Sequence, residues 1–252
     1  MSLLKVEALS VTLRDKPVLQ DISLQVKAGE VVGLSGPKGA GKTTLMRAIL
    51  GLVPHQGGSS LAQMPPRMRG RLAAWMPQQR EIAWPVSVDT LVTLGRTPHL
   101  NAGQRVTDTD RAAVAQAIAR MDLQGLRHRT ATRLSGGEQA RALIARALAQ
   151  QTPLLMTDEP IAGLDPAHQI ATMQVFAALA AEGRAVIVSL HDLGLAVRHC
   201  TRLIVLDGGR ITADGARRDV LTPDLLRDTF NISAWFNDTP LGPVFQPVGV
   251  LQ

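Results

Sequence analysis

The segment GPKGAGKTT, residues 36–44, constrains this chain more than any other stretch of its sequence. Its Gly36, Gly41, Lys42 and Thr43 satisfy the spacing G-x-x-x-x-G-K-[ST] between an apolar run and a helix-like segment. Glycines allow backbone N–H groups to turn around phosphate oxygens, and the helix that follows presents the positive end of its dipole. The segment therefore predicts a phosphate-binding loop, with Lys42 on the β- and γ-phosphates and Thr43 on a magnesium ion.

Three short apolar runs have the character of parallel strands covered on both faces. They are EVVGLSG (30–36), PLLMTDE (153–159) and AVIVSLH (185–191). Each leads through a polar or glycine-containing turn into a helix-like segment, at 42–51, 166–182 and 192–200 respectively. Strands that alternate with helices predict a doubly wound sheet, whose ligands bind at the carboxyl ends of the strands.

The rest of the chain divides by pattern. Residues 1–29 alternate apolar and polar side chains, as half-buried antiparallel strands do. TDTDRAAVAQAIARMD (107–122) predicts a capped amphipathic helix inside a helical insertion. RLIVLDGGRITADG (202–215) predicts a hairpin around its two glycines. The tail from Pro223 onward, with Trp235, Phe236 and Phe245, is expected to pack on the surface or on a second copy.

Composition limits the classes of partner. The 252 residues carry a formal charge of +6, but the arginines are scattered and only seven aromatic side chains are present, so we expect no nucleic acid partner. No apolar stretch reaches the length of a membrane span, and Lys5 and Glu7 interrupt any signal-like segment. The single cysteine, Cys200, suits a reducing cytosol.

The run PLLMTDE ends in two acids, Asp158 and Glu159. A carboxylate at the end of a buried strand can hold magnesium, while its neighbour accepts a proton from an attacking water. Two adjacent acids are also typical of a turn after a strand. Beside a phosphate loop we favour the first interpretation, with Asp158 on the metal and Glu159 as general base.

The segment LSGGEQ (134–139) alone is explained by a serine that caps a helix near Glu138. Together with the two elements above, it resembles the signature motif of ATP-binding cassette (ABC) ATPases. The resemblance covers nearly the whole chain, in the family's order. GPKGAGKTT resembles the Walker A motif, AAWMPQQ the glutamine loop, LLMTDEP the Walker B motif, IAGLD the D-loop and VSLHDL the histidine switch.

This resemblance implies a fold and a site. The fold is an α/β P-loop NTPase core with an N-terminal antiparallel β subdomain and an inserted α-helical subdomain. Within one ABC ATPase domain, 1–252, the expected parts are the core at about 1–79 and 135–222, the insertion at 80–134 and a C-terminal extension at 223–252.

ATP and Mg²⁺ are the implied cofactors, and the implied activity is ATP hydrolysis. The implied catalytic residues are Glu159, His191 and Gln78; the metal ligands are Thr43, Gln78 and Asp158; the nucleotide contacts are Gly36, Pro37, Lys38, Gly39, Ala40, Gly41, Lys42, Thr43, Thr44, Ser135, Gly136, Gly137 and Asp165.

The resemblance also implies partners. Two copies of the chain would enclose two ATP molecules in a head-to-tail dimer. This dimer would lie on the cytoplasmic face of the inner (plasma) membrane. It would bind polytopic permease subunits there and act indirectly with a substrate-binding protein. GRTPHL (95–100), SLHDLGLAVRHC and GRITADGARRDVLTP resemble subunits of importers for iron-siderophore, haem or cobalamin. In such importers the segment at about 79–100, here with Trp84, would receive a helix of the permease. An ordinary helical subdomain surface is the alternative interpretation of that segment.

Two other functions compete with the importer. One is a soluble ABC ATPase that acts on ribosomes or DNA, although such relatives generally carry two cassettes or long coiled-coil insertions. The other is a regulatory cassette that does not hydrolyse ATP, which intact Gln78, Glu159 and His191 oppose. The chain also departs from the family at two positions: Leu13 stands where an aromatic side chain usually stacks on adenine, and Lys38 stands where asparagine is common.

Overall fold

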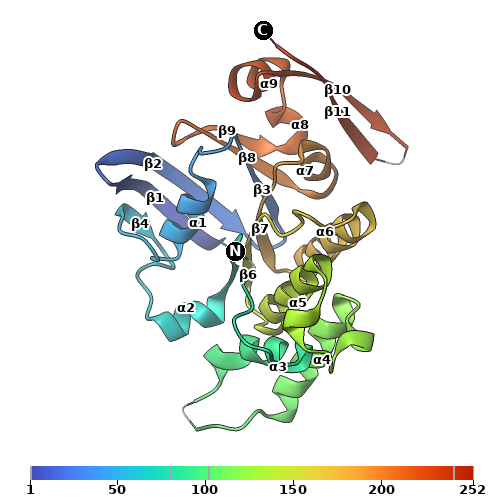
Figure 1. The fold of residues 1–252 in the computed structure, drawn as a ribbon. Coiled ribbons are helices and arrows are strands. Elements are labelled where there is room, and N and C mark those ends of the chain that lie inside the picture. Colours follow the sequence, from blue (N-terminus) through green and yellow to red (C-terminus); the bar gives the residue numbers. More distant parts are fainter. Residues whose placement is uncertain (1, 80, 102, 241, 252) are drawn as a thin grey trace. The chain divides into compact units, whose positions relative to one another are not determined.

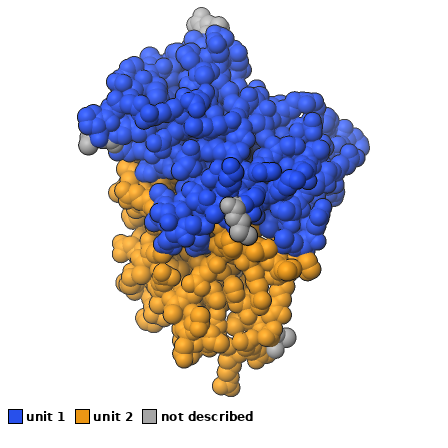
Figure 2. Space-filling view, turned by 180° about the vertical axis from the view of Figure 1, so that it is seen from behind, with its two compact units in different colours: residues 1–64, 177–252 blue, residues 65–176 orange. Residues whose placement is uncertain are grey.

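The computed structural model describes residues 2–79, 81–101, 103–240 and 242–251. Figure 1 shows the order of its helices and strands. The chain divides into two compact units, drawn in different colours in Figure 2: unit 1 comprises residues 1–64 and 177–252, and unit 2 comprises residues 65–176. Residues 80 and 102 of the predicted insertion, and residues 241 and 252 of the predicted extension, lie outside the described residues.

Four strands of unit 1 pair side by side, in the order β7 (Ala185–Ser189), β3 (Val31–Ser35), β8 (Arg202–Asp207) and β9 (Arg210–Ala216). β3 runs parallel to both β7 and β8, and β9 returns antiparallel to β8. Every residue of β3 and β7 is buried, as expected for parallel strands covered on both faces. The predicted strands at 30–36 and 185–191 and the predicted hairpin at 202–215 are confirmed.

A second sheet of unit 1 contains β1 (Ser2–Leu13), β2 (Lys16–Lys27) and β4 (Gln56–Ser59), with β1 in the centre and all pairs antiparallel. Arg14 and Asp15, with φ of 48° and 62°, connect β1 to β2. Two successive left-handed residues are typical of a type I′ hairpin turn, which matches the twist of the strands. The antiparallel N-terminal strands predicted from alternation are therefore confirmed.

The helices of unit 1 are α1 (Lys42–Ile49), α7 (Leu193–His199), α8 (Arg217–Val220) and α9 (Pro223–Phe230). After α9 the tail forms an antiparallel hairpin of β10 (Ile232–Thr239) and β11 (Gly242–Val250), labelled in Figure 1. Phe245 is 6% exposed, whereas Trp235 is 50% exposed. The sequence did not predict this hairpin, because the prolines of β11 argue against a strand.

Unit 2 contains one parallel pair of strands, β5 (Ala73–Met76) and β6 (Leu154–Asp158), and is otherwise mainly helical. Its helices are α2 (Pro66–Leu72), α3 (Val88–Thr93), η1 (Leu94–His99), α4 (Asp108–Arg120), η2 (Gln124–Leu126), η3 (Ala131–Arg133), α5 (Gly136–Ala149) and most of α6 (Pro166–Ala181). The strand predicted at 153–159 and the capped helix predicted at 107–122 are confirmed. Over the described parts of both units, none of the helices combines the length and the apolar character that a bilayer crossing requires.

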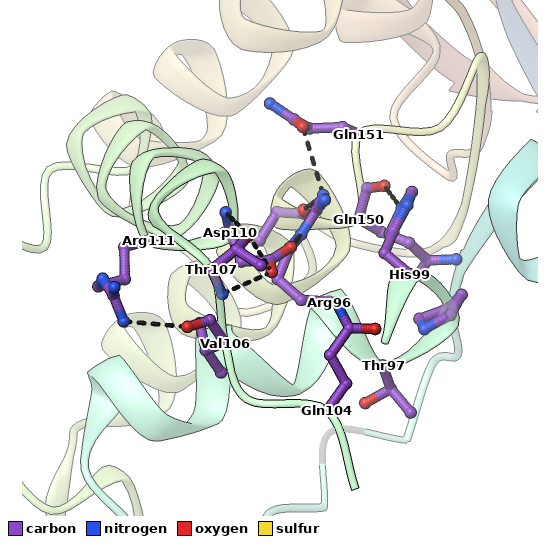
Figure 3. Close-up of polar contacts among 12 residues, drawn as sticks. Arg96, Thr97, His99, Gln104, Val106, Thr107, Asp110, Arg111, Gln150 and Gln151 are labelled. Carbon is purple, nitrogen blue, oxygen red and sulfur yellow. Dashed lines mark hydrogen bonds and ion pairs between the residues drawn. The ribbon is translucent and has the colours of Figure 1, made fainter. Parts of the chain in front are cut away.

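The start of α4 is fixed by a capping box. The Thr107 hydroxyl accepts a hydrogen bond from the Asp110 N–H at 3.2 Å, and Asp110 Oδ2 accepts one from the Thr107 N–H at 3.0 Å. Asp110 is 3% exposed and also pairs with Arg96, whose Nε lies 2.8 Å from Oδ1 (Figure 3). Hydrogen bonds from the Thr107 hydroxyl and N–H, and then from Arg96, lower the pKa of Asp110 to about 2 from its ordinary 3.8.

This pKa predicts an acid-dependent loss of stability. In the unfolded chain Asp110 binds a proton below about pH 4, while the folded chain resists protonation until about pH 2. The stabilisation is therefore complete above pH 4 and is lost as the pH falls towards 2. Thermal unfolding of the wild type and of Asp110→Asn from pH 6 to pH 2 tests this: the gap between their midpoints should narrow on acidification, and a constant gap would contradict it.

Candidate functional site

The phosphate loop predicted at residues 36–44 lies in unit 1, between β3 and α1. Gly36 has φ of 143°, and a Cβ placed on it would lie 2.1 Å from the carbonyl oxygen of Leu206. Gly41 has φ of 100°, and its Cβ would lie 2.7 Å from a methyl group of Leu19. The two glycines of the motif are therefore required both by backbone conformation and by close neighbours.

The side chain of Lys42 turns back over this loop. It is 7% exposed, and its Nζ donates to the carbonyl oxygens of Gly36 at 2.7 Å and Pro37 at 3.0 Å. α1 begins after Gly41 with no capping side chain and no acid in its first turn. The ammonium group and the positive end of α1 thus lie together, which favours binding of an anion at this loop.

The structure also describes the remaining loop residues that are predicted to contact nucleotide. Pro37 is half-buried, Lys38 and Gly39 are exposed, and the Ala40 N–H donates to the Pro37 carbonyl at 3.2 Å. Thr43 and Thr44 occupy the first turn of α1.

His191 is exposed and lies just beyond the carboxyl end of β7, in the same unit as the loop. The preceding residue, Leu190, donates from its N–H to the Leu34 carbonyl at 3.2 Å and accepts from the Ser35 hydroxyl at 3.3 Å. Since β3 and β7 are parallel neighbours, their carboxyl ends bring His191 and the phosphate loop to one edge of the strands.

Unit 2 carries the predicted acids and the glutamine. Asp158, 1% exposed, is the last residue of β6, and Glu159 follows it. Gln78 follows the neighbouring strand β5, and its Nε2 donates to Glu159 Oε2 at 2.9 Å. The parallel pairing of β5 with β6, with Met76 level with Thr157, explains this contact.

Glu159 also has a backbone conformation that the sequence does not reveal. Its φ is 49°, in the left-handed region. For a residue with a Cβ this conformation costs about 1–2 kcal/mol relative to the right-handed region. Such strain concentrates at functional sites, where the surrounding structure holds it in place. The strain and the Gln78 contact both distinguish Glu159 from an ordinary residue after a strand.

The predicted signature segment begins α5. The Ser135 hydroxyl accepts from the Glu138 N–H at 3.3 Å, and Glu138 Oε2 accepts from the Ser135 N–H at 2.8 Å. The second of these bonds is the main reason that the pKa of Glu138 lies below its usual value. Gly136 and Gly137 form the first turn of the helix. The capping explanation for this motif is therefore confirmed, and it leaves a nucleotide role for the same hydroxyl to be tested.

Two substitutions separate these roles of Ser135. Ser135→Ala should lower the free energy of unfolding by about 1 kcal/mol, whereas Ser135→Gly should lower it by only a few tenths. If the hydroxyl acts only as a cap, ATP hydrolysis should follow this ranking; if it also binds nucleotide, both variants should lose hydrolysis alike. Urea unfolding and steady-state hydrolysis of the two variants give the comparison. Equal stability of the two variants would contradict the capping assignment.

Asp165, predicted in the D-loop, precedes α6. Its Oδ1 accepts from the His168 N–H at 3.0 Å, and its Oδ2 lies 2.5 Å from His168 Nδ1. These bonds, the backbone one first, lower the pKa of Asp165 below its usual value. A Cβ added to Gly137 would lie 3.5 Å from Leu164 Cδ2, so this signature glycine lies beside the D-loop within unit 2.

The predicted metal ligands are distributed over both units: Thr43 belongs to unit 1, and Gln78 and Asp158 belong to unit 2. Among the residues that the structure describes, no group of three or more His, Cys, Asp or Glu could hold a metal by itself. The hydroxyl, amide and carboxylate oxygens fit Mg²⁺, which binds few protein oxygens and completes its shell with phosphates and water.

Comparison with known proteins gives consistent results. A family model described as ABC transporter matches residues 19–162. The cobalamin import ATP-binding protein BtuD of Halobacterium salinarum is 42% identical over 235 residues, which cover 90% of this chain and 58% of that protein. The chain thus spans little more than half the length of this relative. The hemin import ATP-binding protein HmuV of Pseudomonas entomophila is 39% identical over 249 residues, covering 94% of this chain and 96% of the relative.

Solved structures agree with the fold. A chain of a metal-chelate type ABC transporter in an inward-facing conformation superposes with a TM-score of 0.86 at 25% identity, covering 99% of this chain and 98% of the other. A dimeric ATP-binding cassette with ADP and phosphate bound superposes with a TM-score of 0.75 at 23% identity, covering 85% and 99%. The α/β cassette fold with its antiparallel β subdomain and helical elements is thereby confirmed.

Proposed function

Since this chain belongs to the ABC transporter family, we propose that it is the ATP-hydrolysing subunit of a membrane importer for an iron-siderophore, haem or cobalamin. The observation that carries the hydrolytic part is the 2.9 Å hydrogen bond between Gln78 and the strained Glu159. The cargo class rests on the similarity to cobalamin and hemin import ATP-binding proteins.

In this proposal the phosphate loop binds the triphosphate of ATP. Lys42 exchanges its loop carbonyl partners for oxygens of the β- and γ-phosphates, and the N–H groups at the start of α1 bind the same anion. Contacts to phosphoryl oxygens that gain charge in the transition state lower the barrier more than they stabilise bound ATP. Residues Gly36–Thr44 therefore both bind and activate the nucleotide.

Glu159 accepts the proton of the attacking water, and Gln78 orients the Glu159 carboxylate by donating to Oε2. His191 contacts the γ-phosphate and the water from the end of β7. Thr43, Gln78 and Asp158 would hold Mg²⁺, which neutralises charge on the phosphate oxygens when bound.

The remaining predicted residues act between two copies of the chain. Ser135, Gly136 and Gly137 bind the nucleotide held by the second copy, and Asp165 contacts the same interface. ATP binding closes the pair and hydrolysis opens it, which is a ligand-driven shift in population. The pair acts on the cytoplasmic face of the plasma membrane, where residues 79–100 contact the permease and a substrate-binding protein delivers the cargo on the other side.

Recognition of the base depends on two departures from the family pattern. Leu13 is 38% exposed and offers no aromatic ring for stacking, while Lys38 is exposed on the phosphate loop. If Lys38 offsets the lost stacking by its charge, Lys38→Asn should weaken ATP binding about fivefold at low salt. Titration with a fluorescent ATP analogue measures this effect, with Lys27→Asn as the control because Lys27 is exposed and lies at the opposite end of β2 from the residue that pairs with Leu13. Equal affinity for wild type and Lys38→Asn would exclude the compensation.

The importer proposal is tested by isolating the tagged chain from membranes of its native host in mild detergent and identifying what accompanies it. A polytopic permease should be recovered, and a substrate-binding protein purified with it would narrow the cargo. If ribosomal or DNA-repair proteins were recovered reproducibly in the presence of ATP, and no permease was recovered, the importer assignment would be wrong. The chain would then be reassigned as a soluble ABC ATPase.

A further inference from the structure

One buried side chain of unit 2 connects three elements that are distant in sequence. Arg96, 5% exposed, lies in η1, and its Nε donates to Asp110 Oδ1 of α4 at 2.8 Å. Its Nη1 donates to the Ala149 carbonyl, at the end of α5, at 2.8 Å and to Gln151 Oε1 at 3.3 Å. Figure 3 shows the guanidinium between the side chains of Asp110 and Gln151.

Backbone contacts hold η1 against the last turn of α5. A Cβ placed on Gly95 would lie 2.1 Å from the Arg146 carbonyl oxygen, so the two backbones touch directly. His99 Nε2 lies 2.8 Å from the Gln150 carbonyl (Figure 3). The Gln150 side chain donates in turn to the carbonyls of Gly70 and Ala73, which ties β5 to the same point. Packing this close leaves η1 no room to slide without moving α5.

Helix α5 connects the contacts with η1, at its C-terminal end, to the signature segment at its N-terminal end. The helix has 14 residues, from Gly136 to Ala149, and therefore spans about 20 Å. Its first turn carries the Ser135 cap, and its last turn carries the Ala149 carbonyl that Arg96 binds. A displacement of η1 would therefore reach the signature end through α5, because rigid secondary-structure elements carry coupling between distant sites.

The segment around η1 also has exposed apolar side chains. Trp84 is 69% exposed, and Leu94, the first residue of η1, is 44% exposed. Under the proposed function this segment contacts the permease, and the inference below rests on that function for the identity of the partner.

We propose that Arg96 is a positioning residue that couples the permease-binding segment to the signature helix α5. A permease that moves η1 shifts α5 through the guanidinium, and so sets the position of Ser135 and the two glycines that follow it. Arg96 touches neither ATP nor the reacting atoms in this proposal. The Gly-Arg-Thr-Pro-His run at 95–99 then has a physical explanation: the glycine permits backbone contact, and the arginine and histidine bind the end of α5.

The test uses the chain assembled with its permease in lipid nanodiscs, and compares Arg96→Lys with Arg111→Lys. The lysine at 96 can pair with Asp110 but has no planar fork to reach Ala149 and Gln151 as well. Arg111 pairs with Asp108 on the same helix, but both side chains are exposed, at 62% and 97%. The measurements are basal hydrolysis of the isolated chain, permease-stimulated hydrolysis, and KM for ATP.

We expect Arg96→Lys to lower the stimulation by the permease about tenfold, with basal hydrolysis and KM unchanged, and Arg111→Lys to behave as wild type. Wild-type stimulation in Arg96→Lys would overturn the proposal. An equal loss of basal and stimulated rates would also overturn it, because a purely structural role acts on both.

If Arg96→Lys fails to fold, Asp110→Asn decides, because its single side-chain oxygen keeps the bond from the Thr107 N–H of the α4 cap only by turning its NH2 group towards Arg96, which breaks the link to the guanidinium. Loss of stimulation in that variant supports the coupling, and full stimulation overturns it. A wild-type chain that no permease stimulates would instead refute the proposed function, and the coupling with it.

Discussion

Glu159→Gln is expected to lower ATP hydrolysis by about 100- to 10,000-fold, the range that removal of a general base produces. Glutamine has the same shape but cannot accept the proton of the attacking water. Its side-chain oxygen can still accept the hydrogen bond from Gln78, so the local geometry should persist. ATP binding should therefore stay within a few fold of wild type. Single-turnover hydrolysis and equilibrium ATP binding, measured on one preparation, distinguish loss of chemistry from loss of binding.

Glu7→Gln is the matched control for this experiment. Glu7 lies on β1 with its side chain 65% exposed, and its carboxylate pairs with Lys5, whose side chain is 51% exposed. The same chemical change there should leave hydrolysis unaltered. A Glu159→Gln protein with full turnover would refute the assignment of the base, whatever its stability.

Arg96→Met is expected to lower the free energy of unfolding by about 3–5 kcal/mol, because it leaves a buried carboxylate without its cation. Asp110 would keep its bonds to Thr107 but lose the guanidinium 2.8 Å away. Urea unfolding followed by tryptophan fluorescence measures the loss, since Trp75 and Trp84 both lie in unit 2.

The exposed ion pair of Arg111 with Asp108, both on α4, provides the comparison for the buried pair. Arg111→Met removes an ion pair with Asp108 whose side chains are 62% and 97% exposed. Its effect should stay within about 0.5 kcal/mol. Equal stabilities of the two methionine variants would mean that burial of the Arg96 pair contributes nothing, and would contradict the prediction.

The strands and the phosphate loop could be predicted because their signals are local. The five residues of β3 and of β7 are all buried, and a continuous apolar run is the only pattern that suits such a position. Gly36 and Gly41 of the loop are set by backbone conformation and by contacts that leave no room for a side chain. The residues of the candidate site were predicted from the same motifs, supported by resemblance.

The contacts among the candidate residues could not be predicted, because they depend on distant parts of the chain. Gln78 and Glu159 are 81 positions apart, and only the pairing of β5 with β6 brings them together. Arginine is usually exposed, so nothing in the sequence indicates that Arg96 is buried. The hairpin of β10 and β11 was missed for the opposite reason: its prolines give a local signal against a strand, and tertiary packing of Phe245 outweighs it.

Because the backbone of Glu159 is left-handed, the residue that best suits stability at this position differs from the residue that is proposed to support hydrolysis. Glycine adopts φ of 49° without a steric cost, so Glu159→Gly would remove the strain together with the carboxylate. Selection for a durable fold alone would therefore favour replacement of this residue, whereas under the proposed function selection for turnover retains it. Screens of this chain for thermostability should be expected to enrich inactive proteins at position 159, unless hydrolysis is selected at the same time.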